Sequence, residues 1–392
     1  MIIDCDTHFM PRDAFDRVPG ALAARRPVVK LDENGIYVDL DFPGRPVPLK
    51  EATPLAAPGT GSEYPGMVDM EARLKDYVEM GIERTCLLAQ FSGWWSYLIE
   101  PELATAMAHS WNLSVLDLMK KHPKHTVGIA LVALQDPAAA TREMAWAKEQ
   151  GFGGVAIDKV FPVHTHAYSE SLGSQRQLWP FFREAQALDV PIFLHTVQHG
   201  HRVSNNPWFQ KEGLDFFAPN EGQMSLVSLF TSGLLDTYPK LKFIFTEAGT
   251  EFIKPLVQRL DKTFGSAIVD YDNEDATPFF RGRGPGHGDE NLQRARALTP
   301  LDVYLEKNKK PASHYFRNNF FFTIETEEAG FPESIDFLGA DRFLFATDYP
   351  HDDPGGAMKF RDVELLAKHQ RISEKDKQRI RFENAAEFLH LG

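Results

Sequence analysis

Short apolar runs recur along the whole chain and alternate with amphipathic segments. Eight of these runs are rich in Val, Ile, Phe and Thr, and they span residues 2–8, 84–90, 126–134, 151–158, 190–196, 242–248, 319–325 and 342–348. The runs are nearly continuous in apolar residues, a pattern typical of strands that are covered on both faces of a parallel sheet. The pattern therefore predicts eight parallel strands.

Amphipathic helices are predicted between most of these runs. In residues 67–81, for example, Met67, Met70, Leu74 and Tyr77 recur at helical spacing. Strands and helices that alternate eight times predict an α/β fold of the (β/α)8 TIM-barrel type.

Three longer segments interrupt this alternation within a single predicted domain, residues 1–392. They cover residues 36–66, 197–222 and 268–311, and the first of them is rich in Gly and Pro. Loops of this length in a compact domain usually form lids, binding segments or interfaces. We therefore expect loop insertions over the C-terminal face of the barrel, where such folds bind their ligands.

The composition narrows the class of partner. The 392-residue chain is 43% hydrophobic, and its formal net charge of −13 disfavours nucleic acid and anionic membrane surfaces. No stretch approaches the roughly 18 apolar residues that a membrane span needs. Cys5 and Cys86 form no CxxC motif or disulfide framework, and no basic segment with an apolar core precedes the first run. We expect a cytoplasmic protein with a small-molecule substrate.

Ionisable side chains stand where several predicted strands end. They are Asp6 and His8 in the first run, His195 in the fifth, Glu247 in the sixth and Asp348 in the eighth. The carboxyl ends of the strands form the catalytic face of a barrel, and burial of such groups without partners is costly. Oxygen and imidazole ligands without a thiolate suit a divalent zinc, manganese or iron ion. We predict that these five residues hold a metal, with zinc as the first expectation.

Further residues have predicted catalytic or supporting roles. Glu247, Asp348 and His351 are the catalytic candidates, because Glu247 and His351 can act as general acid or base, or bind a second metal. Asp4, one step deeper in the barrel, is expected to orient a neighbour. Candidates for substrate contact follow the second, fourth and fifth runs, and they are Trp94, Lys159, His199 and His201. Core packing of the tryptophan and solvation of the lysine are the alternatives.

Several long segments resemble a known family. They are EARLKDYVEMGIERTCLL, VGIALVALQDPAAATREMAWAKEQGFGGVAID, LWPFFREAQALDVPIFLH, FATDYPHDD and RIRFENAAEFLHL, in that order over nearly the whole chain. On these segments the chain resembles the amidohydrolase-related branch of the metal-dependent hydrolase superfamily. That branch includes aminocarboxymuconate-semialdehyde decarboxylase and the resorcylate-type aromatic acid decarboxylases. The resemblance implies a metal-dependent hydrolase or carboxy-lyase, commonly a homo-oligomer, that cleaves a C–C or C–N bond of a small carboxylated substrate.

The resemblance also implies roles for single residues. The first strand of the family carries an HxH pair followed by xxP, and DTHFMP places Asp6 at the first His position while keeping His8. His195 and Asp348 match the metal ligands of strands five and eight. At strand six the family has a His followed by one residue and Gly, whereas this chain has TEAG, so Glu247 replaces the acid–base His. A carboxylate titrates about two pKa units below imidazole, and it needs burial or a like charge to act as an acid near neutrality.

Three functional hypotheses follow from these residues. In the first, one divalent metal polarises a substrate oxygen while Glu247 or His351 moves protons for C–C or C–N cleavage. In the second, Asp6 and Glu247 help to hold two metals in an iron or manganese–iron oxygenase. In the third, the chain is a non-catalytic, metal-bearing subunit that forms a hetero-oligomer with a related chain. The first hypothesis is the default of the family, and the number of metals per chain separates it from the second.

Overall fold

The helices and strands of the chain follow the predicted alternation. The computed structural model describes residues 1–43, 64–89, 98, 100–158, 172–195, 222–223, 225–268, 310–324, 326, 328, 330–351 and 360–391. The strands are β1 (Ile3–Asp4), β2 (His8–Phe9), β3 (Val28–Leu31), β4 (Tyr37–Asp41), β5 (Arg84–Ala89), β6 (Thr126–Leu131), β7 (Gly154–Asp158), β8 (Ile192–His195), β9 (Phe243–Phe245), β10 (Phe320–Ile324) and β11 (Phe343–Phe345). The α-helices are α2 (Met70–Met80), α3 (Pro101–Lys121), α4 (Pro137–Glu149), α5 (Trp179–Ala187), α8 (Leu234–Thr237), α9 (Ile253–Ile268), α13 (Ala312–Asn318), α14 (Phe331–Leu338), α15 (Asp362–Lys368), α16 (Glu374–Gln378) and α17 (Asn384–Phe388). Short 3-10 helices are η1 (Gly20–Arg25), η2 (Pro65–Met67), η3 (Leu172–Ser174), η4 (Arg176–Leu178) and η5 (Ala340–Arg342), and η6 (Arg379–Glu383) is π-helical.

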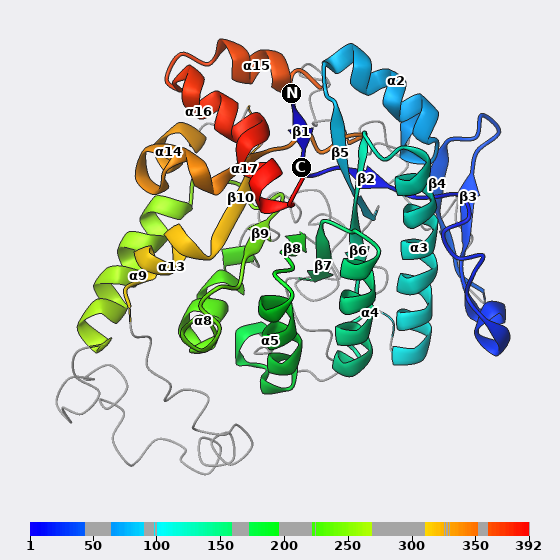
Figure 1. The fold of residues 1–392 in the computed structure, drawn as a ribbon, viewed down its shortest axis with the longest axis horizontal. Helices are drawn as coiled ribbons and strands as arrows, with labels where there is room; N and C mark the ends of the chain where they lie inside the picture. The colour runs from blue at the N-terminus through cyan, green and yellow to red at the C-terminus, as the bar shows by residue number, and fades with distance from the viewer. Residues whose placement is uncertain are drawn as a thin grey trace, which may run out of the picture.

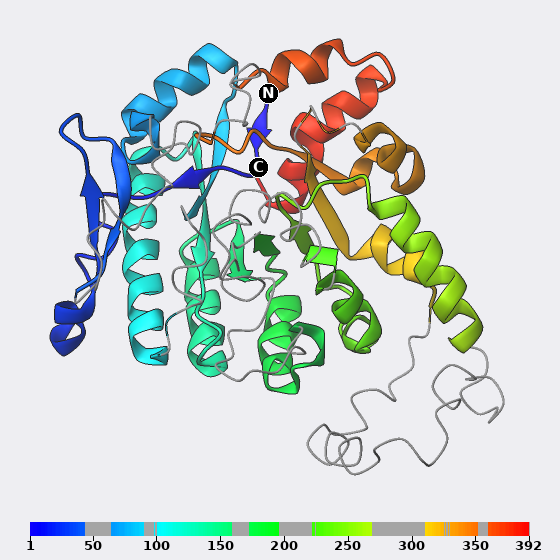
Figure 2. The same cartoon turned by 180° about the vertical axis from the view of Figure 1, so that it is seen from behind.

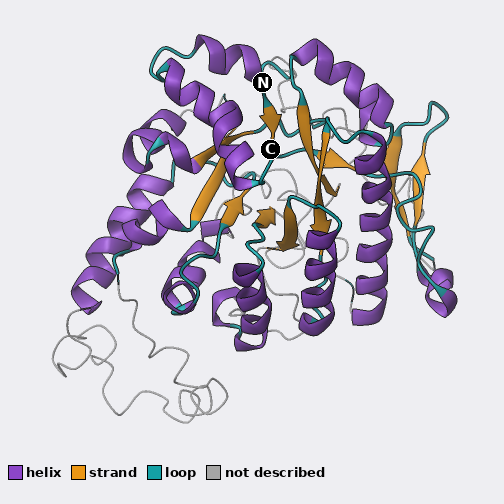
Figure 3. Cartoon of the chain, in the orientation of Figure 1, coloured by secondary structure: helices purple, strands orange, loops and turns teal. Residues whose placement is uncertain are grey.

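The parallel strands form a barrel with helices on its outside. Neighbouring strands pair in the order β1, β5, β6, β7, β8, β9, β10 and β11. The main-chain amide of Cys5 donates a hydrogen bond to the carbonyl of Phe345 (2.9 Å), which joins the first strand segment to the last. Helices surround these strands in both views of the ribbon (Figures 1 and 2), and colouring by secondary structure shows the strands inside the ring of helices (Figure 3). The predicted (β/α)8 barrel is confirmed, and each of the eight apolar runs contains a barrel strand.

The first predicted strand is divided into two short strands by a bend. β1 and β2 both pair with β5, through Ile3 opposite Arg84 and His8 opposite Leu88. Between them, Thr7 forms a parallel bridge with Tyr349, after β11. The bend lies at the carboxyl end of the barrel's first strand, and it carries the candidate residues of the first run.

Helix α2 begins later than predicted. Asp69 caps its first turn, accepting hydrogen bonds from the amides of Glu71 and Ala72, so Met67 lies before the helix in η2. Gly81 ends the helix in the left-handed conformation, with φ of 77°. The buried stripe also differs from the prediction, because Arg73 is buried and Leu74 is only partly buried.

An antiparallel hairpin of β3 and β4 corrects the prediction for residues 36–66. That segment was predicted to be a loop, but β4 lies within it and pairs with β3. The turn contains Asn34 and Gly35, with φ of 78° at the glycine, a sequence that favours tight hairpin turns. The hairpin lies beside α3 at the side of the barrel (Figures 1 and 2). Residues 44–63 and nearly all of the insertions predicted at 197–222 and 268–311 lie outside the described residues.

Two sequence features bear on the environment of the protein. Cys5 and Cys86 are both buried and carry free thiols. Among the described residues, none of the helices has the length and apolar character needed to cross a bilayer.

Candidate metal centre

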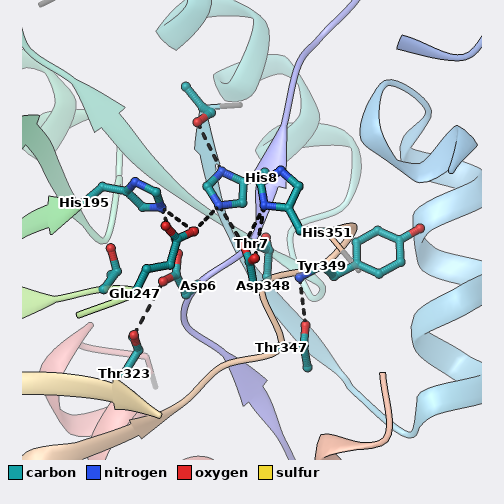
Figure 4. Close-up of polar contacts among 12 residues, drawn as sticks. Asp6, Thr7, His8, His195, Glu247, Thr323, Thr347, Asp348, Tyr349 and His351 are labelled. Atoms are coloured by element: carbon teal, nitrogen blue, oxygen red, sulfur yellow. Dashed lines mark hydrogen bonds and ion pairs between the residues drawn. The ribbon is translucent and has the colours of Figure 1, made fainter. Parts of the chain in front are cut away.

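The candidate residues converge at the carboxyl ends of the barrel strands. Asp6 follows β1, His8 begins β2, His195 ends β8, Glu247 follows β9 and Asp348 follows β11. Figure 4 shows their side chains pointing toward one another from these separate strands. The structure therefore brings together residues that lie up to 342 positions apart in the sequence, as their places at strand ends predicted.

Four of these side chains form one potential ligand group. One ligand atom from each of Asp6, His8, His195 and Glu247 lies within 4.8 Å of the others. Glu247 Oε1 accepts a hydrogen bond from His8 Nε2 (2.9 Å) and lies at ion-pair distance from His195 Nε2 (3.1 Å). Asp6 Oδ1 lies 3.6 Å from His195 Nε2. The glutamate thus lies between the two imidazoles that the sequence assigned to a metal.

A second, overlapping group extends the centre toward His351. It comprises His8, Glu247, Asp348 and His351, again with ligand atoms within 4.8 Å of one another. Asp348 Oδ1 lies 2.9 Å from His8 Nε2, and His351 Nδ1 donates to the Asp348 carboxylate at 3.0 Å. The rings of His8 and His351 stack, with their centroids 4.3 Å apart.

Two site residues have unusual backbone conformations. Glu247 has φ of 48° and Asp348 has φ of 52°, in the left-handed region that L-residues rarely adopt. The Asp348 amide donates to the carbonyl of Asp6 (3.1 Å), which helps to hold this turn. Strained positions of this kind concentrate at functional sites, where the surrounding fold holds them. Here they turn the two carboxylates toward the histidines.

The charges in the centre are strongly coupled. Burial lowers the pKa of His8, but Asp348 and Glu247 outweigh burial and raise that pKa well above its usual value. Burial favours the neutral form of Glu247, yet the histidines His195 and His8 hold its pKa well below the usual range. Burial, reinforced by the charge of Glu247, raises the pKa of Asp6 well above normal. Without a cation, protons on the site therefore balance a surplus of carboxylates.

The donor set fits a divalent cation. Asp6 is fully buried, and its Oδ1 has no hydrogen-bond partner among the described residues. A buried carboxylate oxygen without a hydrogen bond is energetically costly unless it has another partner. A metal ion bound among these side chains would be such a partner. The donors are carboxylate oxygens and imidazole nitrogens, which suit zinc, manganese or iron.

Cation binding at this centre should strengthen as the pH rises. His8 has a raised pKa, so a cation must displace its proton before binding the imidazole. Each displaced proton changes the apparent affinity by about tenfold per pH unit, so affinity should fall steadily as the pH drops below the raised pKa of His8. Isothermal titration in buffers of different ionisation enthalpy would count the protons released. A pH-independent affinity without proton release would contradict this prediction.

Asp4 does not belong to the ligand groups but binds the segment between β11 and Asp348. Its carboxylate accepts hydrogen bonds from the amide (3.1 Å) and hydroxyl (2.6 Å) of Thr347 and from the hydroxyl of Tyr77 (3.1 Å). Burial raises the pKa of Asp4 to about 7, although these bonds oppose the shift. The residue thus orients the segment that leads to Asp348, in keeping with the supporting role expected for it.

Two residues that contact the centre were not predicted from the sequence. Thr323 Oγ1 lies 3.5 Å from Asp6 Oδ2, and Arg73 donates to the main chain of His8. A threonine near the end of β10 carries no distinctive signal. Arg73 stands three residues after Met70 and four before Tyr77, so its place in the helical stripe could have indicated burial.

The predicted substrate-contact residues lie outside the described residues. These are Trp94, Lys159, His199 and His201. Their role stays a prediction.

Sequence comparisons agree with the family expected from the sequence. The amidohydrolase family model matches residues 3–391. Gamma-resorcylate decarboxylase from Polaromonas sp. (strain JS666 / ATCC BAA-500) is 26% identical over 331 residues, which cover 83% of this chain and 87% of that protein.

Solved structures agree with the fold. The 2,6-dihydroxybenzoate decarboxylase from Rhizobium has a TM-score of 0.66 at 21% identity, covering 100% of this chain and 98% of that chain. The 5-carboxyvanillate decarboxylase from Novosphingobium aromaticivorans DSM 12444 is complexed with manganese and 4-hydroxy-3-methoxy-5-nitrobenzoic acid. It has a TM-score of 0.68 at 20% identity, covering 100% of this chain and 96% of that chain. At these identities the structural similarity establishes the barrel.

Proposed function

Because the chain belongs to the amidohydrolase family, whose model matches residues 3–391, we propose that it is a divalent-metal-dependent decarboxylase of small aromatic carboxylic acids. The observation that carries the proposal is the convergence of carboxylates and imidazoles at the carboxyl ends of the strands. The similarity to gamma-resorcylate decarboxylase supports the reaction, since it extends over 83% of the chain.

The metal is assigned to Asp6, His8, His195 and Asp348. When bound, a divalent ion polarises a substrate oxygen and stabilises the negative charge that develops on the substrate. The carboxylates Asp6 and Asp348, with Glu247 beside them, favour manganese over the zinc first expected, because oxygen donors suit manganese better. The manganese in the Novosphingobium relative points the same way.

The remaining groups of the centre are assigned to proton transfer. Loss of CO2 from an aromatic acid leaves the ring carbon short of one proton, which the site must deliver. Glu247 is ionised in the described geometry, so it must take up a proton before it can donate one to the ring. Asp348 accepts from Nδ1 of His351 and so orients this imidazole, as a carboxylate orients the general base of a catalytic triad. His351 is therefore the second candidate proton carrier.

The choice among the three hypotheses, the oligomeric state and the location of the protein are proposed on other grounds. The similarity to decarboxylases favours this reaction over the iron or manganese–iron oxygenase and over a non-catalytic subunit. We propose a homo-oligomer in line with the family resemblance, and a cytoplasmic location in line with the free thiols of Cys5 and Cys86.

The test combines metal analysis with assays of CO2 release and of oxygen uptake. Protein purified without added metal or chelator should contain about one divalent ion per chain by mass spectrometry. The manganese-loaded protein should release CO2 from 2,6-dihydroxybenzoate, 5-carboxyvanillate or a related hydroxybenzoate, and chelation should abolish the release. Two irons per chain with substrate-dependent oxygen uptake would instead favour the oxygenase. A metal-loaded protein that decarboxylates none of these acids would overturn the proposal.

A further inference from the structure

Arg73 on α2 is a fully buried cation next to the metal centre. Its side chain has 0% exposure, and Lys377 is the other buried lysine or arginine among the described residues. Lys377 has Glu374 as an ion-pair partner, whereas no described carboxylate pairs with Arg73. Because an arginine keeps its charge in proteins, such burial is costly unless hydrogen bonds compensate for the lost water. The contacts of the guanidinium show where this compensation comes from.

The hydrogen bonds of Arg73 hold the segment that carries two metal candidates. Nη1 donates to Thr7 Oγ1 (2.9 Å), and Nη2 donates to the main-chain carbonyl of His8. Nε donates to the carbonyl of Gly66 (3.0 Å), in η2 just before α2. Thr7 lies between Asp6 and His8, so one planar donor group fixes the main chain of this pair.

The same guanidinium also packs against the segment that follows Asp348. Its carbon lies 4.7 Å from the ring centroid of Tyr349, a distance suited to a cation–π contact. The carbonyl of Tyr349 accepts a hydrogen bond from the His8 amide (2.8 Å). Arg73 therefore contacts two chain segments. One carries His8, and the other directly follows Asp348, whose carboxylate lies beside His8 Nε2.

A neutral residue could pack in this position without the cost of burying a charge. Arg73 instead brings a rigid fork of donors and a positive charge close to a centre rich in carboxylates: Asp6, Glu247 and Asp348. Both properties suit Arg73 to holding the main chain beside the metal candidates in place.

We propose that Arg73 is a positioning residue of the metal centre, which sets the geometry of Asp6, His8 and Asp348 for metal binding. The inference rests on the proposed function only in requiring a metal at this centre. It predicts that the affinity for a divalent ion depends on Arg73 even in the absence of substrate.

The test measures Mn²⁺ binding to the full-length chain and its variants without substrate. Arg73→Met removes the charge and the donors, and it should weaken Mn²⁺ binding by about 10–100-fold, as is typical for groups that orient metal ligands. Arg73→Lys keeps the charge and should recover part of this loss. Thr7→Val removes one acceptor of the guanidinium and should weaken binding in the same direction. The electron paramagnetic resonance spectrum of the bound Mn²⁺ should also change in the Arg73 variants.

Asn112 offers a matched control for a purely structural effect. Its buried amide donates to the Leu131 carbonyl (2.9 Å) and accepts from the Leu131 amide (2.7 Å), so it braces β6 against α3 through contacts that involve none of the metal candidates. Asn112→Ala should lower the denaturation midpoint and leave the Mn²⁺ affinity of the folded protein unchanged. This contrast separates a loss of stability from a loss of ligand geometry.

The outcomes distinguish this inference from the proposed function. Folded Arg73→Met protein that binds Mn²⁺ like the wild type would overturn the inference, whatever the activity of the wild type. If Arg73→Met does not fold, unchanged affinity in both Arg73→Lys and Thr7→Val would overturn it instead. A wild-type chain that binds no divalent ion would also overturn it. A wild type that binds Mn²⁺ but decarboxylates no aromatic acid would contradict the proposed function alone.

Discussion

An Asp348→Asn variant should fold, bind divalent metal far more weakly and lose nearly all activity. The carboxylate oxygen Oδ1 lies 2.9 Å from His8 Nε2 and 3.0 Å from His351 Nδ1, so one atom serves both histidines. Asparagine keeps the size of the side chain and tolerates the left-handed backbone at this position, where alanine would add strain. The variant thus removes the charge and one strong oxygen donor while sparing the turn.

The expected loss of metal affinity exceeds the loss seen for groups that orient metal ligands without binding the metal. Such groups typically change metal affinity by 10–100-fold, so we expect at least about a hundredfold loss for Asp348→Asn. Mass spectrometry of the purified variant and titration with Mn²⁺ would measure it, and kcat/KM of the decarboxylation should fall in parallel. Asp341→Ala, which removes an exposed carboxylate before β11 that pairs with Arg342, should change neither. A folded Asp348→Asn protein with full metal content would remove this residue from the centre.

The barrel could be predicted because its strands are buried on both faces. All positions of β6 and β10 are buried, so their sequences must be nearly continuous in apolar residues. The hairpin of β3 and β4 lies outside the barrel, and β3 alternates between exposed and partly buried positions. Its signal was the Asn34–Gly35 turn rather than an apolar run, and the Gly and Pro residues further along the segment obscured it.

The site could be predicted only in part, for a related reason. A parallel barrel brings all carboxyl ends to one face, so the meeting of His8, His195 and Asp348 follows from their positions in the sequence. Sequence spacing carries no information on which side chain stands between two others. The position of Glu247 between two imidazoles, and the burial of Arg73 beneath His8, depend on the closure of the barrel between its first and last strands.

Replacing Glu247 by glutamine should remove most of the activity and leave the metal in place. The change keeps the shape of the side chain but removes a group that can carry a proton. General acid–base groups typically contribute about 10²–10⁴-fold, so kcat/KM should fall by a factor in that range. Asp6, His8, His195 and Asp348 remain as ligands, so the metal content should match the wild type. The residual activity should depend less on pH, because an amide does not titrate over the range of the assay.

Metal content decides which role the glutamate has. Loss of the metal in parallel with activity would make Glu247 a ligand, whereas retained metal with lost activity supports proton transfer at the position where the family carries a histidine. Glu251→Gln is the matched control, because this exposed carboxylate lies four residues further along and accepts from the Thr250 amide (3.1 Å). It should leave kcat/KM and metal content unchanged. A Glu247→Gln enzyme that keeps more than about a tenth of the wild-type kcat/KM would exclude both roles, since even weak general acid–base groups contribute more.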